Sequence, residues 1–128
     1  MKKIILGFLF LIILGSLNLV FAQSAKRIIF RKGATTANVS GWLKSRNDKA
    51  VFVLRVRRGQ SIEVRLDGGT ISISTTVLNP RGKDIGDRDM QGNSGTENTV
   101  AGDYKIIVSP SRKDDKRRGS FKLQITVK

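Results

Sequence analysis

Apolar residues recur at every second position along several stretches of this chain. In residues 61–66, which read Ser-Ile-Glu-Val-Arg-Leu, apolar side chains alternate with polar or charged ones. Successive side chains of a β-strand point to opposite faces, so this pattern predicts a strand with one buried face. The same period predicts four more inward-facing sets: Phe52, Leu54 and Val56; Ile71, Ile73 and Val77; Tyr104, Ile106 and Val108; and Phe121, Leu123, Ile125 and Val127.

Weaker strands and turn residues complete this pattern. Further strands are predicted at residues 27–31 and 36–43, with a short one near Thr99. Glycine-containing turns separate the strands, at residues 57–60 (Arg-Arg-Gly-Gln), 67–69 (Asp-Gly-Gly) and 79–82 (Asn-Pro-Arg-Gly). No segment after residue 22 has a convincing helical period. The sequence therefore predicts an all-β fold, a single antiparallel β-sandwich or barrel of about eight strands.

The first 22 residues have the features of a secretory signal peptide. Lys2 and Lys3 precede an apolar run over residues 4–20, and Ala22 supplies a small side chain where a signal peptidase cuts. A retained membrane anchor is the alternative, but the run is short for a bilayer span. We predict a cleaved signal peptide, residues 1–22, and one periplasmic or secreted domain, residues 23–128, without a membrane span.

The chain contains no cysteine and no histidine. These absences exclude thiol nucleophiles, disulfides, histidine bases and histidine metal sites. A glycosidase needs two carboxyl groups that face each other across a sugar. The acidic residues here fall mainly in predicted loops or, like Glu63, at outward strand positions. The sequence therefore predicts a binding protein without enzymatic activity or a cofactor.

The chain is strongly basic, with 24 Lys and Arg against 10 Asp and Glu. Removal of Lys2 and Lys3 leaves 22 against 10, a net charge of +12 on residues 23–128. Such a surface attracts an acidic protein cleft, acidic glycans, lipid phosphates or nucleic acid, although charge also serves solubility and protects strand edges. Nucleic acid is disfavoured because Trp42 and Tyr104 are the only Trp and Tyr that could stack on bases.

Trp42 follows Gly41 in a predicted strand. Burial is the commoner outcome for a tryptophan, and we expect it here. Exposure, with the indole free to stack on a sugar, is the alternative.

Two predicted loops are longer than a hairpin requires, and binding sites often lie on such loops. The first, residues 82–99, contains Asp-Arg-Asp-Met-Gln-Gly at 87–92, which is similar to the start of a calcium-binding loop. Asn98 stands where that loop needs a bidentate glutamate. We therefore interpret this segment as a polar loop without a metal.

The second long loop, residues 109–119, is basic. Its cations are Arg112, Lys113, Lys116, Arg117 and Arg118. A guanidinium group matches the geometry of a carboxylate and stays charged, so this loop suits insertion into an acidic active site. A solvated run of charge is the alternative. A second basic set, Arg55, Arg57 and Arg58, is a candidate extension of the same patch.

Several segments resemble the periplasmic inhibitors of goose-type (g-type) lysozyme, the PliG family. They are Phe-Arg-Lys-Gly at 30–33 with the following residues to Gly41, Arg-Arg-Gly-Gln at 57–60, and Ala-Gly-Asp-Tyr at 101–104 with the remainder of the chain. The resemblance covers the domain in order, except for residues 68–100. The chain is also similar, more distantly, to bacterial pre-peptidase C-terminal domains, which share several of these turns.

The resemblance implies an inhibitor whose late loop inserts basic residues into the lysozyme cleft and engages the catalytic acid. Arg112 matches the first of two arginines in this loop, and the second falls on Lys116 or, with a shift of one residue, on Arg117. Lysine keeps the charge but lacks the two-pronged guanidinium. A tyrosine expected in an early loop is absent, and Arg46 or Asn47 stands near its place.

Two other functions remain open from the sequence. One is a basic accessory domain of the cell envelope that binds acidic glycan or lipid phosphate. The other is a structural envelope protein without a defined ligand.

Overall fold

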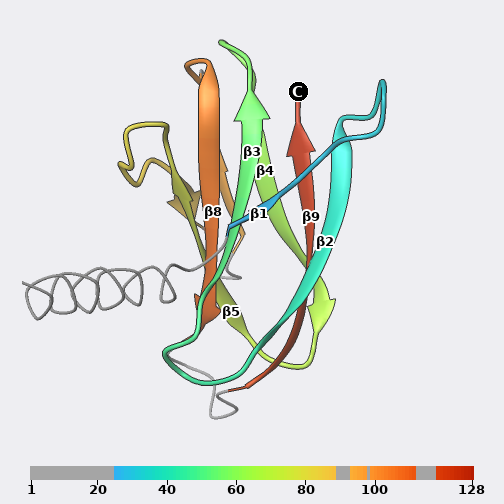
Figure 1. Cartoon of the computed structure of the whole chain (residues 1–128), viewed down its shortest axis with the longest axis vertical. Helices are drawn as coiled ribbons and strands as arrows, with labels where there is room; N and C mark the ends of the chain where they lie inside the picture. Colours follow the sequence, from blue (N-terminus) through green and yellow to red (C-terminus); the bar gives the residue numbers. More distant parts are fainter. Residues whose placement is uncertain (1–24, 89–92, 98, 112–117) are drawn as a thin grey trace, which may run out of the picture.

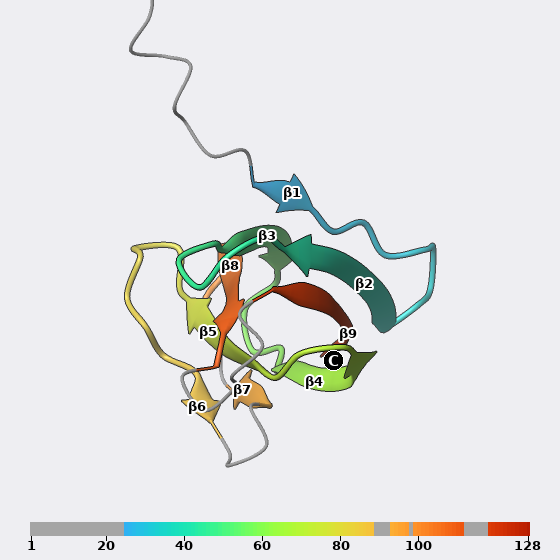
Figure 2. The ribbon, with the colours of Figure 1, turned by 90° about the horizontal axis from the view of Figure 1, so that it is seen from below.

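The computed structural model describes residues 25–88, 93–97, 99–111 and 118–128. In these ranges the chain forms nine strands in two sheets, which pack face to face as a sandwich (Figures 1 and 2). One sheet has the strand order β1-β3-β8-β5, and the other has the order β2-β9-β4-β7-β6. The strands are β1 (Lys26–Arg27), β2 (Thr36–Leu43), β3 (Ala50–Val56), β4 (Ile62–Gly69), β5 (Ile73–Leu78), β6 (Asp87–Arg88), β7 (Ser94–Thr96), β8 (Gly102–Pro110) and β9 (Gly119–Val127). The predicted all-β sandwich is confirmed.

The core lies between the sheets and contains the side chains that the alternation predicts to face inward. Every residue of the four predicted sets on β3, β8, β9 and the β5 region is at most 9% exposed. The rings of Phe52 and Phe121 meet across the core edge to face, with centroids 6.2 Å apart. Burial of these large apolar side chains stabilises the domain without a disulfide.

The predicted turn at residues 67–69 is wrong. These residues form the end of β4, where a bulge between Leu66 and Gly68 shifts the pairing with β9. Gly69 has a φ of +125°, and a Cβ at this position would lie 2.4 Å from the carbonyl oxygen of Ser120. The glycine therefore permits a close approach of two strands instead of ending one.

The first predicted strand is shorter than expected. β1 contains only two residues, and it pairs with β3 in parallel, unlike the other strand pairs. The amide of Ile28 donates to the carbonyl of Val53 at 2.8 Å, after which the chain leaves the sheet. A turn at residues 31–34 then leads into β2, closed by the hydrogen bond from the Ala34 amide to the Arg31 carbonyl.

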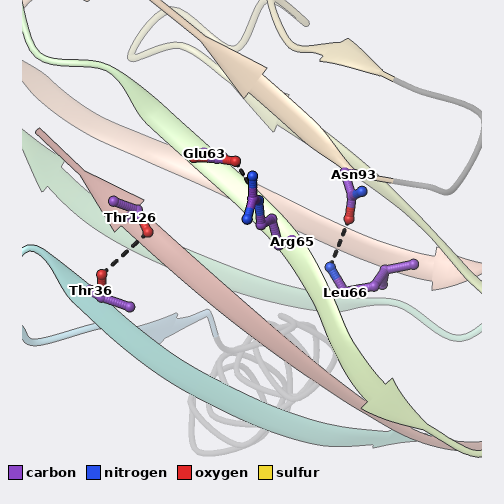
Figure 3. A network of polar contacts seen from close by, with 6 residues as sticks. All are labelled: Thr36, Glu63, Arg65, Leu66, Asn93 and Thr126. Carbon is purple, nitrogen blue, oxygen red and sulfur yellow. Dashed lines mark hydrogen bonds and ion pairs between the residues drawn. The ribbon is translucent and has the colours of Figure 1, made fainter.

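The predicted long loop at residues 82–99 contains two short strands, β6 and β7. The Asn93 side chain accepts a hydrogen bond from the Leu66 amide at 2.8 Å, which holds the start of β7 beside β4 (Figure 3). The hydroxyl groups of Thr75 and Ser94 are buried and bridge the two sheets at 2.9 Å. The short strand expected near Thr99 is therefore β7.

Thr99 itself has a different role. Its hydroxyl lies 3.0 Å from the Arg57 carbonyl and 2.8 Å from the Gln60 carbonyl, and it holds the predicted turn at residues 57–60. No helix in the described ranges is long and apolar enough to cross a membrane. Residues 1–24, which include the predicted signal peptide, lie outside these ranges.

Candidate partner-binding end

Three connections meet at one end of the sandwich, which we call the loop end. The pairing of β2 with β9 ends at Leu43, which lies opposite Gly119. The pairing of β3 with β8 begins at Ala50, which lies opposite Val108. The β2–β3 connection, residues 44–49, therefore lies at the same end as the last residues of β8 and the first of β9. The β4–β5 connection, residues 70–72, joins them there, at the lower end in Figure 1.

The β2–β3 connection is a tight turn that presents cations to solvent. The Asp48 carboxylate accepts hydrogen bonds from the amides of Lys44 at 2.8 Å and of Lys49 at 2.9 Å. The Asp48 amide in turn donates to the Ser45 carbonyl. Because these contacts use the only acidic group of this connection to fix its backbone, Lys44, Arg46 and Lys49 are held exposed around it.

The β4–β5 connection fixes both sides of the base of the β8–β9 connection. The Ser120 amide donates to the Thr70 hydroxyl at 2.8 Å, and the Thr70 amide donates to the Ser120 carbonyl at 2.9 Å. On the other side the Ser111 amide donates to the Ser72 carbonyl at 3.0 Å. These hydrogen bonds hold both ends of the late loop, at residues 111 and 118, against the β4–β5 connection. We call this hydrogen-bonded base the frame, and Arg118 lies exposed beside it.

Three of the predicted partner-binding residues, Arg112, Lys116 and Arg117, lie outside the described residues. The fourth, Arg46, lies at the exposed tip of the β2–β3 connection. The strand register places Arg46 at the same end of the molecule as the base of the late loop. The frame thus brings together two loops that are more than 60 residues apart in the sequence.

The suggestion that Arg55, Arg57 and Arg58 extend this patch is wrong. β3 runs away from the loop end, and Val56 pairs with Gly102 at the opposite end of β8. Arg57 and Arg58 follow Val56 and lie in the turn beyond it. The sequence-based reasoning overlooked Lys44 and Lys49, whose position at the loop end depends on the strand register.

The expectation that Trp42 is buried is also wrong, because this residue is 58% exposed. Leu43, the next residue, is fully buried, so the alternation of β2 turns the indole outward. Trp42 pairs with Ser120 on β9. The indole therefore projects from a paired strand close to the loop end.

A hollow of about 490 Å³ lies beside Trp42. Its lining includes Ser40, Gly41, Asp48, Lys49 and Phe121. A Cβ at Gly41 would lie 2.6 Å from the Phe121 ring, so the ring packs directly against the backbone there. The hollow thus combines an aromatic wall with a charged rim.

Two carboxylates elsewhere on the described surface pair with neighbouring arginines. Glu63 pairs with Arg65 on the outer face of β4 (Figure 3), and Asp84 pairs with Arg88. Within the calcium-like segment only Asp87 and Arg88 are described, and they form β6. The described part of the chain contains no grouping of three side chains suited to a metal ion.

Arg27 and Asp103 form a two-pronged pair across β1 and β8. Two guanidinium nitrogens donate to the two carboxylate oxygens at 3.0 and 3.2 Å. The hydrogen bonds from Arg27, with its charge and that of Arg55, lower the pKa of Asp103 below its ordinary value of 3.8. This pair secures β1 and lies away from the loop end.

Neither a family model nor a curated protein sequence matches the chain. Solved structures do match it. The periplasmic inhibitor of g-type lysozyme from Aeromonas hydrophila, PliG, is 21% identical with a TM-score of 0.69, over 82% of this chain and 96% of that one. PliG from Salmonella Typhimurium is 20% identical with a TM-score of 0.65, over 84% of this chain and all of that one.

A second group of structures shares the architecture. The pre-peptidase C-terminal domain of a collagenase from Bacillus anthracis is 17% identical with a TM-score of 0.54, over 84% of this chain and 97% of that one. Both groups are those that the sequence resembles. The described domain therefore has the β-sandwich fold of the PliG inhibitors and, less closely, of the pre-peptidase C-terminal domains.

Proposed function

We propose that residues 23–128 form an exported inhibitor of g-type lysozyme that acts in the periplasm or outside the cell and has no enzymatic activity of its own. The likeness to solved g-type lysozyme inhibitors, whose chains are covered over 96–100% of their length, carries this proposal. The loop end is the proposed contact surface. Arg112 and Lys116 or Arg117 enter the lysozyme cleft, and Arg46 lies beside them.

The charge of the loop end supports this assignment. A lysozyme cleft contains carboxyl groups, and a protruding cation that enters it replaces lost hydration with a charge-assisted hydrogen bond. The described cations Lys44, Arg46, Lys49 and Arg118 are exposed at the same end as the base of the late loop. They attract an acidic partner before contact and raise the rate of association.

The rigidity of the frame also supports the proposed inhibitor function. Backbone hydrogen bonds at Thr70, Ser72 and Ser120 hold the base of the late loop at fixed positions. Binding from such a frame orders fewer groups, and less of the interaction free energy is lost on association.

The proposal is tested with the chain exported under its own N-terminal segment and purified. We expect the mature chain to begin at Gln23 and to inhibit cell-wall lysis by goose-type lysozyme. Chicken-type and invertebrate-type lysozymes, assayed in parallel, define its selectivity. If the goose-type enzyme keeps full activity at micromolar concentrations of the protein, the proposal is wrong.

The role of the late loop is tested by Arg112→Ala. Loss of a buried charge-assisted contact weakens inhibition by roughly 30-fold or more. Arg81→Ala, which removes an exposed arginine from the turn at residues 79–82, is the matched control. Equal inhibition by the two variants, both folded as judged by circular dichroism, contradicts the assignment of Arg112.

The distribution of charge favours one alternative, a basic envelope domain that binds acidic glycan or lipid phosphate. Arg57 and Arg58 lie at the end opposite the loop end, so positive charge is not confined to one surface. Binding of this kind is diffuse and falls steeply with salt. Titration with anionic lipid vesicles or lipopolysaccharide at 0.05 and 0.5 M NaCl, compared with lysozyme, distinguishes the two functions.

A further inference from the structure

We infer that Trp42 and the hollow beside it form an apolar anchor of the protein contact surface at the loop end. This inference rests on the proposed function and assigns a contact to the lysozyme, at the rim of its acidic cleft. The partner chemistry is an apolar or aromatic side chain next to carboxylates.

The position of Trp42 is fixed by its strand. Pairing with Ser120 holds its backbone. Because Leu43, the next residue, is fully buried, a rotation of the strand that buries Trp42 would expose Leu43. Trp42 is 58% exposed, whereas the core residues of β3, β8 and β9 are at most 8% exposed. An aromatic side chain on a rigid element provides a large contact area at a low cost in conformational entropy.

The surface beside the indole has the composition of a contact centre. The Phe121 ring packs against Gly41, and Phe121 and Phe52, whose rings meet edge to face, both line the hollow. Asp48 and Lys49 also line the hollow, and Lys49 is exposed. An apolar centre within a polar rim is the arrangement found where a few residues dominate protein–protein binding.

The position of the hollow indicates which kind of partner binds there. The Asp48 side chain lines the hollow and also fixes the β2–β3 connection, so the hollow is continuous with the turn that carries Arg46. The cations Lys44, Arg46 and Lys49 favour a partner with acidic groups at this place. A neutral glycan gains nothing from these charges, and a second copy of this basic chain is repelled by them.

The other two large apolar side chains exposed in the described ranges lie elsewhere. Val100 is 59% exposed and precedes β8 at the opposite end, and Ile29 is 83% exposed and follows β1 on the way to that end. They have similar or greater exposure but lie away from the loop end. They are therefore matched controls for Trp42.

The test compares Trp42→Ala with Ile29→Ala and Val100→Ala in binding to goose-type lysozyme. Loss of a central tryptophan contact weakens binding by roughly 30-fold or more, and the two controls change it by less than threefold. Trp42→Phe, which keeps an aromatic ring, recovers most of the affinity. Thermal unfolding verifies that all four variants fold.

A spectroscopic measurement separates direct contact from indirect effects. Trp42 is the only tryptophan in the sequence, so 5-fluorotryptophan labels one site, and its ¹⁹F resonance shifts when unlabelled lysozyme binds. Chitin oligosaccharides and increased protein concentration leave the resonance unchanged. A shift with either of these and not with lysozyme overturns the inference in favour of a glycan or of self-association.

The failures of the two proposals are distinguishable. If the unaltered chain binds lysozyme but Trp42→Ala binds equally well, or the resonance does not move, only the anchor is wrong. If the unaltered chain does not bind lysozyme, the anchor and the proposed function are both wrong.

Discussion

Gly69 shows how a single residue decides the local structure of this sandwich. Its φ of +125° is unfavourable for other residues, and the space that a Cβ would need is taken by the Ser120 carbonyl. The Asp-Gly-Gly motif is typical of a turn, and the sequence gives no indication that Ser120 approaches it. The clash that requires glycine is made by a residue about 50 positions away, which local reasoning does not include.

We expect Gly69→Ala to lower the free energy of unfolding by at least about 2 kcal/mol, from backbone strain and the clash with Ser120. Gly82→Ala is the control, because Gly82 also has a positive φ, of +83°, but a Cβ there meets nothing within 4 Å. Its cost is about 1 kcal/mol, from strain alone. Urea unfolding measures both, and an equal cost for both argues against the close approach of β4 and β9.

The ion pair of Arg27 and Asp103 predicts a pH effect. Because the folded-state pKa of Asp103 is lowered, the pair contributes stability above the unfolded value, near 3.8, and loses it as the pH falls through the folded value. Arg27→Gln removes the donor and raises the pKa of Asp103, which an NMR titration of its side-chain carboxyl carbon measures. An unchanged pKa shows that the pair does not form in solution.

At the scale of elements, alternation predicted the long strands because each buries one face in the same core. The sets on β3, β8 and β9 are correct to the residue. The bounds of the short strands β1 and β7 differ from those predicted because these strands depend on single long-range contacts, such as that of Asn93 with Leu66 for β7 and that of Ile28 with Val53 for β1. No local periodicity encodes such contacts.

The pairing of β2 with β9 makes a prediction about one edge of the sandwich. β2 is the edge strand of its sheet, and the Val127 amide donates to the Thr35 carbonyl one residue before the strand begins. Hydrogen-bonded pairs alternate along an antiparallel ladder. The amide of Val39 therefore points to β9, and that of Ser40 points to the free edge.

Proline substitutions at these neighbouring positions should accordingly differ. Val39→Pro removes a ladder hydrogen bond and should lower the free energy of unfolding by at least about 2 kcal/mol. Ser40→Pro removes only a donor at the free edge and should cost less than about 1 kcal/mol. Urea unfolding of both variants checks this, and a larger loss for Ser40→Pro contradicts the register of β2.

At the scale of the whole molecule, the sandwich gathers sequence-distant loops at one end. The sequence identified the late basic loop and Arg46 as candidates, and the frame places the base of that loop and Arg46 together. Sequence patterns alone could not indicate that Arg57 and Arg58 lie at the end opposite the loop end, or that Trp42 is exposed. Both facts follow from strand direction and register. Long-range pairing therefore decides which charges share a surface.

The central claim is that the loop end, rather than net charge, blocks g-type lysozyme. The most direct test compares Arg46→Glu/Arg118→Glu at the loop end with Arg57→Glu/Arg58→Glu at the opposite end, since both change the net charge equally. At 0.15 M salt, screening beyond about 8 Å limits the effect of distant charges. We predict that the inhibition constant for goose-type lysozyme rises at least about tenfold for the first pair and less than about threefold for the second. An equal rise for the two pairs, or a greater rise for the second, contradicts the account.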